Sequence, residues 1–273
     1  MSLSKRYQIN TRSGGKALNL TENRGLEHSI DTETPPILSG LKYFGSVGAS
    51  NTIVTSGAVQ TLGDKSGNNI AFTQGSAGKR PTYNASDVSF GGRPSMTFDG
   101  VDDVLGTVAA NPFGALTNIT AYFVTKDLST KGYLLCVAPG GLAGALLFYY
   151  YTFSSYNQYV VLFDNPSNTS SGISNPIIQT PGAHVSAFSG KLSQGGNLWK
   201  CMVDQSQDQS VSFISNATAG GSTNITRQAF IGARANTDNF GSGTYTDILV
   251  YTDAHDDQQM ALMSNWLKVR NGI

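Results

Sequence analysis

The chain has 273 residues, and its 18 lysines and arginines balance 18 aspartates and glutamates, so the formal net charge is zero. No global field therefore favours nucleic acid or an anionic membrane as a partner. With 31 glycines, 13 phenylalanines, 12 tyrosines and only 13% charged residues, the composition is typical of a turn-rich β protein with a neutral polar surface.

Residues 1–36 differ from the rest of the chain. Basic residues from Lys5 to Lys16 precede the first acidic residue, Glu22, and few large apolar side chains follow. Such a segment cannot offset its own ordering entropy. It is either a floppy terminus or an extended arm held against a partner or its own domain, and we favour the arm. Pro35 and Pro36 mark its end, because neither can donate to a sheet.

The amino terminus has no apolar h-region, and no apolar run approaches the length needed to span a membrane. We therefore expect a soluble protein.

From residue 37 onward, short apolar runs alternate with clusters of Gly, Asn, Ser and Pro, a pattern that predicts strands separated by turns. The predicted strands cover residues 51–55, 58–62, 94–98, 117–125, 133–137, 145–151, 158–163, 184–189, 199–203, 210–214, 227–231 and 244–251. Because no helix separates them, they predict an all-β, two-sheet antiparallel sandwich over residues 37–273.

The most informative stretch is 93–105, a short strand, a turn and a second short strand. Ser95 to Phe98 alternate polar and apolar residues, and Asp99-Gly100 then breaks the strand. Asp102 and Asp103 follow, which gives three carboxylates close together. They predict either a turn stabilised by Asp99 and Asp102 through backbone N–H bonds or a calcium site with hard oxygen ligands, and we favour the turn without a metal.

One helix is predicted, at the carboxyl end. Asp256 and Asp257 supply an N-cap, apolar residues from Met260 to Leu267 recur at helical spacing, and Asn271-Gly272 ends the helix. Lys268 and Arg270 suit the negative end of the helix dipole. We expect the apolar face to pack on the sandwich, because so short a helix needs tertiary contacts.

The sulfur and imidazole groups do not form a metal or nucleophile pattern. Cys136 and Cys201 lie far apart in apolar surroundings, so we expect buried free thiols. His28, His184 and His255 lack ligand spacing, except that His255 adjoins the acidic residues we assign to the helix cap. No Gly-x-Ser-x-Gly elbow or phosphate-binding loop is present, so no cofactor is predicted.

Several motifs together carry a resemblance to a known family. They are Leu62-Gly-Asp-Lys-Ser-Gly-Asn68, Lys79-Arg-Pro-Thr-Tyr83, Gly92 to Leu105, Ile231-Gly-Ala-Arg234, and Tyr245 to Tyr251 with the helix after it. Residues 37–273 resemble the concanavalin A-like, laminin G-type jelly roll, which is common in bacteriophage virion proteins and bacterial surface proteins. The family often has Trp where this chain has Gly63, so an aromatic platform for sugar stacking is missing there.

The resemblance allows a test for catalysis. Retaining glycosidases on this sandwich resemble one another in placing two glutamates on one strand, because the chemistry needs paired carboxylates about 5 Å apart. Here Glu22, Glu27 and Glu33 are the only glutamates, and all lie within residues 1–36. The central pair, Asp102 and Asp103, would point to opposite faces if it lay on a strand. We therefore predict no catalytic residues and no enzyme.

Aromatic residues make the best case for sugar recognition. Phe148 to Tyr151, with Phe153, Tyr156 and Tyr159, would place alternate rings on opposite faces of neighbouring strands. Rings that face away from the core suit either a carbohydrate or the surface of another subunit, so no ligand-binding residue is assigned.

We predict a non-enzymatic phage virion protein, a decoration, tail or baseplate component. Its lectin-like sandwich would be displayed outward, and residues 1–36 would anchor it to other virion proteins, with oligomers in the assembly. The first alternative is a carbohydrate-binding adhesin module for host-surface glycans, and the second is a polysaccharide-degrading enzyme.

Overall fold

The structure is a computed structural model that describes residues 33–110, 112–114, 116–128, 131–137, 146–153, 156–165, 168–174, 182–191, 200–204, 211–213, 228–235 and 238–273. The chain divides into two units, Met1–Thr32 and Glu33–Ile273. Residues 1–32 of the predicted arm lie outside the described residues, so the role of the arm stays a prediction.

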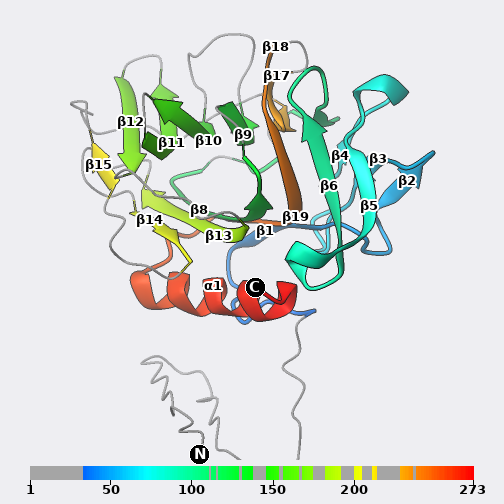
Figure 1. Cartoon of the computed structure of the whole chain (residues 1–273). Coiled ribbons are helices and arrows are strands. Elements are labelled where there is room, and N and C mark those ends of the chain that lie inside the picture. The colour runs from blue at the N-terminus through cyan, green and yellow to red at the C-terminus, as the bar shows by residue number, and fades with distance from the viewer. Residues whose placement is uncertain are drawn as a thin grey trace, which may run out of the picture. The chain divides into compact units, whose positions relative to one another are not determined.

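The unit Glu33–Ile273 is built from short antiparallel strands and one long helix (Figure 1). The strands are β1 (Leu41–Ser46), β2 (Ile53–Thr55), β3 (Ala58–Leu62), β4 (Phe72–Thr73), β5 (Thr82–Asp87), β6 (Arg93–Asp99), β7 (Leu105–Thr107), β8 (Asn118–Lys126), β9 (Lys131–Val137), β10 (Leu146–Phe153), β11 (Tyr156–Asn165), β12 (Asn168–Ser174), β13 (Ala183–Lys191), β14 (Lys200–Val203), β15 (Val211–Phe213), β16 (Ala229–Ile231), β17 (Ala233–Ala235), β18 (Asp238–Phe240) and β19 (Ser242–Tyr251). The helix is α1 (Asp257–Asn271), and two 3-10 turns cover Ala77–Lys79 and Val88–Phe90.

The strand pairings form two layers. In the first layer, β14, β13, β8 and β19 are neighbours in that order. Strand β19 also pairs with β1 and with β6, and β6 pairs with β5. In the second, the order is β2, β3, β4, β7, β16, β9, β10, β11, β12 and β15. A single pairing between Ala58 and Thr82 joins the layers, so the strands form one curled 17-stranded sheet. The predicted all-β antiparallel sandwich is confirmed.

The core between the layers follows from the period of two along each strand. On β8, Ile119, Ala121 and Phe123 face the opposite layer, while Tyr122 and Val124 point outward. Phe123 meets Phe148 of the second layer at 5.9 Å between ring centroids, and Phe188 on β13 meets the same ring at 5.4 Å. These aromatic contacts fix the two layers face to face.

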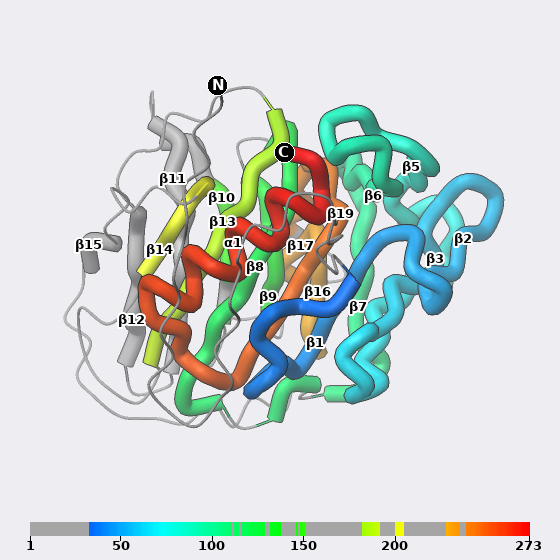
Figure 2. Tube along the Cα trace, turned by 90° about the horizontal axis from the view of Figure 1, so that it is seen from below, coloured from blue at the N-terminus to red at the C-terminus, as the bar shows by residue number. Residues whose placement is uncertain are grey.

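The outer face of the first layer is covered by α1, which crosses β13, β14 and β8 in Figure 2. Asp256 caps the helix in a capping box with Gln259, and Gly272 ends it in the left-handed conformation. Met260, Met263, Trp266 and Leu267 are buried against residues of β1, β8, β13 and β19. The predicted helix and its packing face are both confirmed.

The turn after β3 shows why Gly63 stands where the resembled family often has Trp. A Cβ atom at Gly63 would overlap the backbone oxygen and side chain of Asn51, so no larger residue fits. The next residue, Asp64, accepts bonds from the backbone N–H groups of Phe44, Ser66 and Ile70 at 3.0, 2.8 and 3.3 Å. The family-like turn is therefore built for hydrogen bonding and close backbone approach.

Cys136 and Cys201 are both buried thiols, as predicted. Burial raises the pKa of the Cys201 thiol.

Among the described residues, no helix combines the length and the apolar character needed to cross a bilayer.

Candidate functional site

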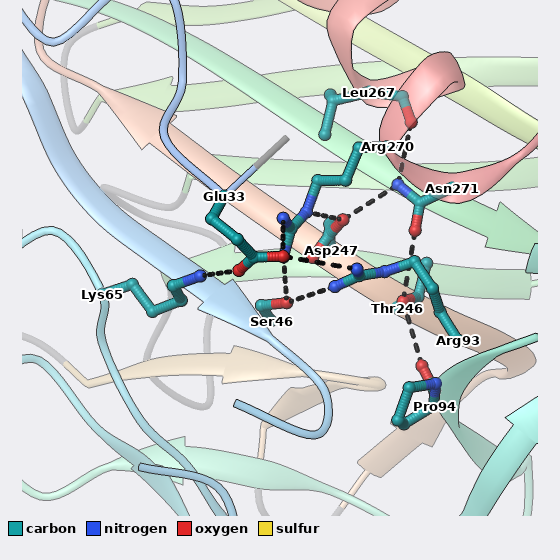
Figure 3. Close-up of polar contacts among 10 residues, drawn as sticks. All are labelled: Glu33, Ser46, Lys65, Arg93, Pro94, Thr246, Asp247, Leu267, Arg270 and Asn271. Atoms are coloured by element: carbon teal, nitrogen blue, oxygen red, sulfur yellow. Dashed lines mark hydrogen bonds and ion pairs between the residues drawn. The ribbon is translucent and has the colours of Figure 1, made fainter. Parts of the chain in front are cut away.

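Buried charge gathers where the end of α1 meets β1 and β19 (Figure 3). Arg270, in the last turn of α1, has a side chain only 1% exposed. Its Nε donates to Asp247 Oδ2 at 2.9 Å, its Nη2 to Ser46 Oγ at 2.9 Å, and its Nη1 to Glu33 Oε1 at 2.8 Å. A guanidinium can be buried here because its donors find these acceptors.

The backbone of β19 explains how Asp247 reaches Arg270. A register shift between Tyr245 and Asp247 in the pairing with β8 makes Thr246 an extra residue, which is a β-bulge. Without the bulge, Tyr245 and Asp247 would face the same side. With it, Tyr245 points into the core between the layers, while Asp247 points toward α1 and also accepts a bond from Asn271 Nδ2 at 2.9 Å.

Glu33 completes this cluster from the start of the described chain. Its Oε2 lies 2.7 Å from Lys65 Nζ, and its Oε1 lies 2.8 Å from Arg270 Nη1 and 3.6 Å from Arg93 Nη1. Partial burial acts to raise the pKa of Glu33, but hydrogen bonds and positive charge from Lys65 and Arg270 outweigh it and lower the pKa to about 2. The carboxylate therefore stays ionised between three cations. We call Lys65, Arg93 and Arg270 the cationic cluster.

The predicted acidic turn is present, with one change in the role of its residues. Asp99 Oδ1 accepts bonds from the backbone N–H groups of Val101, Asp102 and Asp103 at 2.8, 3.3 and 3.4 Å. The second acceptor is Asp103, whose Oδ2 takes the N–H of Asp99 at 3.0 Å, and not Asp102. The expectation for Asp102 was wrong because Asp102 faces the turn with its N–H and not with its carboxylate.

The same three carboxylates could hold a metal ion, since one ligand oxygen from each lies within 4.8 Å of the others. Burial is the main cause that raises the pKa of Asp103 to about 6, and the charges of Asp99 and Asp102 add to it against the hydrogen bond from the Asp99 N–H. The turn geometry accounts for Asp99 and Asp103 without a cation. The absence of a metal stays a prediction.

The tyrosine-rich strand β10 alternates as predicted over its described side chains. Phe148 and Tyr150 are buried in the core, while Tyr149 is half-buried and stacks on Tyr133 of β9 with centroids 5.5 Å apart and planes at 27°. The side chains of Tyr151, Phe153, Tyr156 and Tyr159 lie outside the described part of the structure. A sugar-binding or subunit-facing role for this surface stays a prediction.

Two histidines have partners that the sequence did not reveal. His184 Nδ1 lies 2.6 Å from Asp204 Oδ2. His255 is not part of the helix cap but is buried, with Nδ1 2.7 Å from the hydroxyl of Tyr122. Burial lowers the pKa of His255 to about 4 despite the nearby acidic residues, so the ring is neutral near pH 7. His28 lies outside the described residues.

These positions bear on catalysis. Asp102 and Asp103 belong to a turn and not to a strand, so the argument from opposite strand faces does not apply to them. Other carboxylates serve the fold, as Asp87 does by binding Lys126 Nζ at 2.9 Å and the Ser89 N–H at 3.0 Å.

The burial of Arg270 was missed in the sequence, where we assigned this residue only to the negative end of the helix dipole. Its position seven residues after Met263 and four after Trp266, within the apolar stripe, was the signal that it is buried.

No family model matches the chain, and no curated protein sequence matches it. Solved structures do match in fold. The ligand-binding domain of botulinum neurotoxin serotype D, in complex with N-acetylneuraminic acid, aligns with a TM-score of 0.55 at 8% identity over 84% of this chain and 51% of that one. The botulinum neurotoxin DC binding domain in complex with rat synaptotagmin II aligns with a TM-score of 0.57 at 10% identity over 84% and 52%.

An arabinofuranosidase complexed with arabinofuranosyl-alpha-1,2-xylobiose aligns with a TM-score of 0.58 at 12% identity over 78% of this chain and 51% of that one. This chain therefore spans about half the length of the structures it matches. At such low identity the likeness shows the fold alone, which is a jelly-roll-like β-sandwich shared by binding domains and a glycosidase.

Proposed function

We propose that this chain is a non-enzymatic display protein of a phage particle, whose concanavalin A-like sandwich binds surface glycans and whose residues 1–36 attach it to other virion proteins. The observation that carries the non-enzymatic part is the placement of carboxylates. No glutamate follows Glu33, and in the close group of three carboxylates Asp99 and Asp103 bind backbone N–H groups. An acid and nucleophile pair needs carboxylates free to face a substrate.

Carbohydrate recognition is supported by the fold neighbours, which include a domain in complex with N-acetylneuraminic acid and another in complex with SialylT. It is also supported by the half-buried Tyr149, whose ring stacks on Tyr133. Such a ring pairs an apolar face with a hydroxyl, which suits sugar rings. The attachment role rests on the resemblance to virion domains and on the division of the chain after Thr32.

Glycan binding is tested on an array of bacterial surface polysaccharides with the full-length protein and a Tyr149→Ala variant. We expect selective retention by the parent and weaker retention by the variant, since stacking on one ring contributes part of the affinity. Retention of no glycan, or equal retention by both proteins, would contradict the proposed surface. The same samples are assayed for new reducing ends.

The second candidate function is a glycosidase, which is favoured by the arabinofuranosidase neighbour. Release of reducing ends by the parent that is lost in Asp103→Asn would support it and refute the non-enzymatic proposal. Steady release that survives this substitution would point to carboxylates elsewhere in the chain.

Attachment is tested by deletion. A protein that lacks residues 1–32 keeps Glu33 and its ion pairs, so we expect a folded sandwich that no longer joins its assembly. The matched deletion of residues 1–36 also removes Glu33 and should be less stable. Incorporation of either shortened protein at normal occupancy would show that the segment is not the attachment device.

A further inference from the structure

The cationic cluster gathers like charges from three distant parts of the sandwich. Lys65 follows β3, Arg93 opens β6 and Arg270 lies near the end of α1. The two guanidinium groups share one acceptor, because Arg93 Nη2 and Arg270 Nη2 both donate to Ser46 Oγ, at 3.3 and 2.9 Å. Like charges held this closely repel, and Asp247 binds only Arg270 among them, so the arrangement is stabilised by a further anion in front of it.

Glu33 supplies that anion, and it uses both carboxylate oxygens. Oε2 binds Lys65, while Oε1 faces Arg270 and Arg93 (Figure 3). A carboxylate held through both oxygens by guanidinium and ammonium donors is the geometry of a specific carboxylate site, not of a loose surface ion pair.

The occupant is more exposed than the groups that hold it. The Glu33 side chain is 61% exposed, whereas those of Lys65 and Arg93 are 23% and 22% exposed and that of Arg270 is 1% exposed. Glu33 therefore covers the cluster from the outside. It is also the first residue of the sandwich unit.

The site has donor capacity that Glu33 does not fill. Arg93 Nε is buried and has no hydrogen-bond partner among the described residues. The Lys65 ammonium lies 5.0 Å from the centre of the Phe44 ring, and the Arg270 guanidinium lies 5.4 Å from it, so an aromatic ring lies beside the charges. A ligand with polar atoms beyond its carboxylate would find additional partners here.

We propose that Lys65, Arg93 and Arg270 form a carboxylate receptor that Glu33 occupies from within the same chain, and that the receptor binds the carboxylate of a separate molecule once Glu33 is withdrawn. The ligand chemistry is a monocarboxylate, which is carried either by a small organic acid or by an acidic sugar. This inference concerns another surface than the tyrosine pair and does not depend on the proposed glycan binding.

The test removes the internal occupant in the full-length chain and supplies an external one. The Glu33→Ala variant is titrated with sodium acetate, sodium glucuronate and glucose, with sodium chloride to keep the ionic strength equal. The readouts are the melting temperature and the heat of binding in a calorimetric titration. Glu33→Gln is the matched control, because its neutral amide still fills the place of the carboxylate.

We expect acetate and glucuronate to raise the melting temperature of Glu33→Ala by about 2–4 °C, to act less on Glu33→Gln and to leave the parent unchanged, while glucose has no effect. A larger effect of glucuronate than of acetate would assign the acidic sugar, and equal effects would assign the carboxylate group alone. The gain should disappear when Glu33→Ala is combined with Lys65→Gln and Arg93→Gln, which spare the buried Arg270.

Two results would overturn the proposal. One is a Glu33→Ala variant that shows neither carboxylate-dependent stabilisation nor heat of binding. The other is stabilisation of equal size in the parent or in the variant without Lys65 and Arg93, because that would be a general salt effect and not occupation of the cluster.

Discussion

Replacement of Asp103 by asparagine removes the buried carboxylate of the acidic turn while keeping its shape. Asp103 is 5% exposed, whereas Asp99 is exposed and Asp102 is half-buried. Its Oδ2 accepts the backbone N–H of Asp99, a task that an asparagine oxygen can also perform. The substitution therefore isolates the free energy of holding a negative charge at this position.

The magnitude follows from the raised pKa of Asp103, about 6 against an ordinary value of 3.8. Between these values the folded state keeps a proton that the unfolded chain has released, so stability falls as the pH rises through about 6. A shift of about two units corresponds to roughly 3 kcal/mol at pH 7. Because a neutral acceptor is weaker than a carboxylate by about 1 kcal/mol, we expect a net gain of about 1–2 kcal/mol, or about 2–8 °C in melting temperature.

Thermal unfolding followed by circular dichroism at pH 4 and pH 7 measures this effect in the parent, Asp103→Asn and Asp102→Asn. The gain should be present at pH 7, disappear near pH 4 and be smaller for Asp102→Asn, since the Asp102 carboxylate accepts no backbone bond within the acidic turn. A gain independent of pH, or a loss at pH 7, would refute the argument. Each sample is also measured with calcium and with a chelator, and a drop of the parent on chelation would replace the turn account with a metal site.

Three further predictions concern the interior. Arg270→Met should lower the free energy of unfolding in urea by about 3–5 kcal/mol, because it leaves the buried Asp247 carboxylate without its cation. The added change Asp247→Asn should recover most of this loss, and no recovery would contradict the pairing. His255, with a pKa of about 4 in place of 6.5, should make stability fall by up to about 3 kcal/mol as the pH drops from about 6.5 to 4, and His255→Asn should flatten that slope. Gly232→Ala should lower the free energy of unfolding by about 2–4 kcal/mol, because its φ is +83° and a Cβ atom would overlap a core phenylalanine ring. Gly57→Ala is the control, since Gly57 has a φ of +78° but open space around it, and it should lower the free energy of unfolding by about 1 kcal/mol in the same urea assay.

The strands that the sequence predicted are those whose residues form a local apolar run or an alternation of polar and apolar residues. Each of the twelve predicted runs overlaps an observed strand, and β8 and β19, which are buried on both faces, were found through their apolar runs. The strand β1 was missed for a definite reason. Tyr43 faces the core between the layers and Phe44 packs under α1, but Lys42, Gly45 and Ser46 interrupt them, so the strand shows neither an alternation nor an apolar run. The polar strand β12 was also missed, since Asn168–Ser174 contains a single large apolar residue, Ile173.

The cationic cluster could not be predicted from the sequence for another reason, which is that its members lie far apart in the chain. Glu33 and Arg270 are separated by 237 positions, and Arg93 and Ser46 by 47. Sequence rules for helices, strands and turns relate residues a few positions apart, so they cannot predict contacts over such separations. An aspartate in the apolar run of β19 could have indicated a buried charge that needs a partner, but the bulge that turns Asp247 toward α1 is a property of the pairing with β8.

The buried pair of Arg270 and Asp247 contributes to the fold in a different way from the apolar face of the same helix. Desolvation cancels much of the attraction within a buried ion pair, so Met263, Trp266 and Leu267 supply most of the stability that holds α1 on the sheet. Apolar contacts tolerate small rotations and shifts, whereas Arg270 reaches Asp247, Ser46 and Glu33 together in one placement of the helix. The charged end of α1 therefore sets the register of the helix on the sheet.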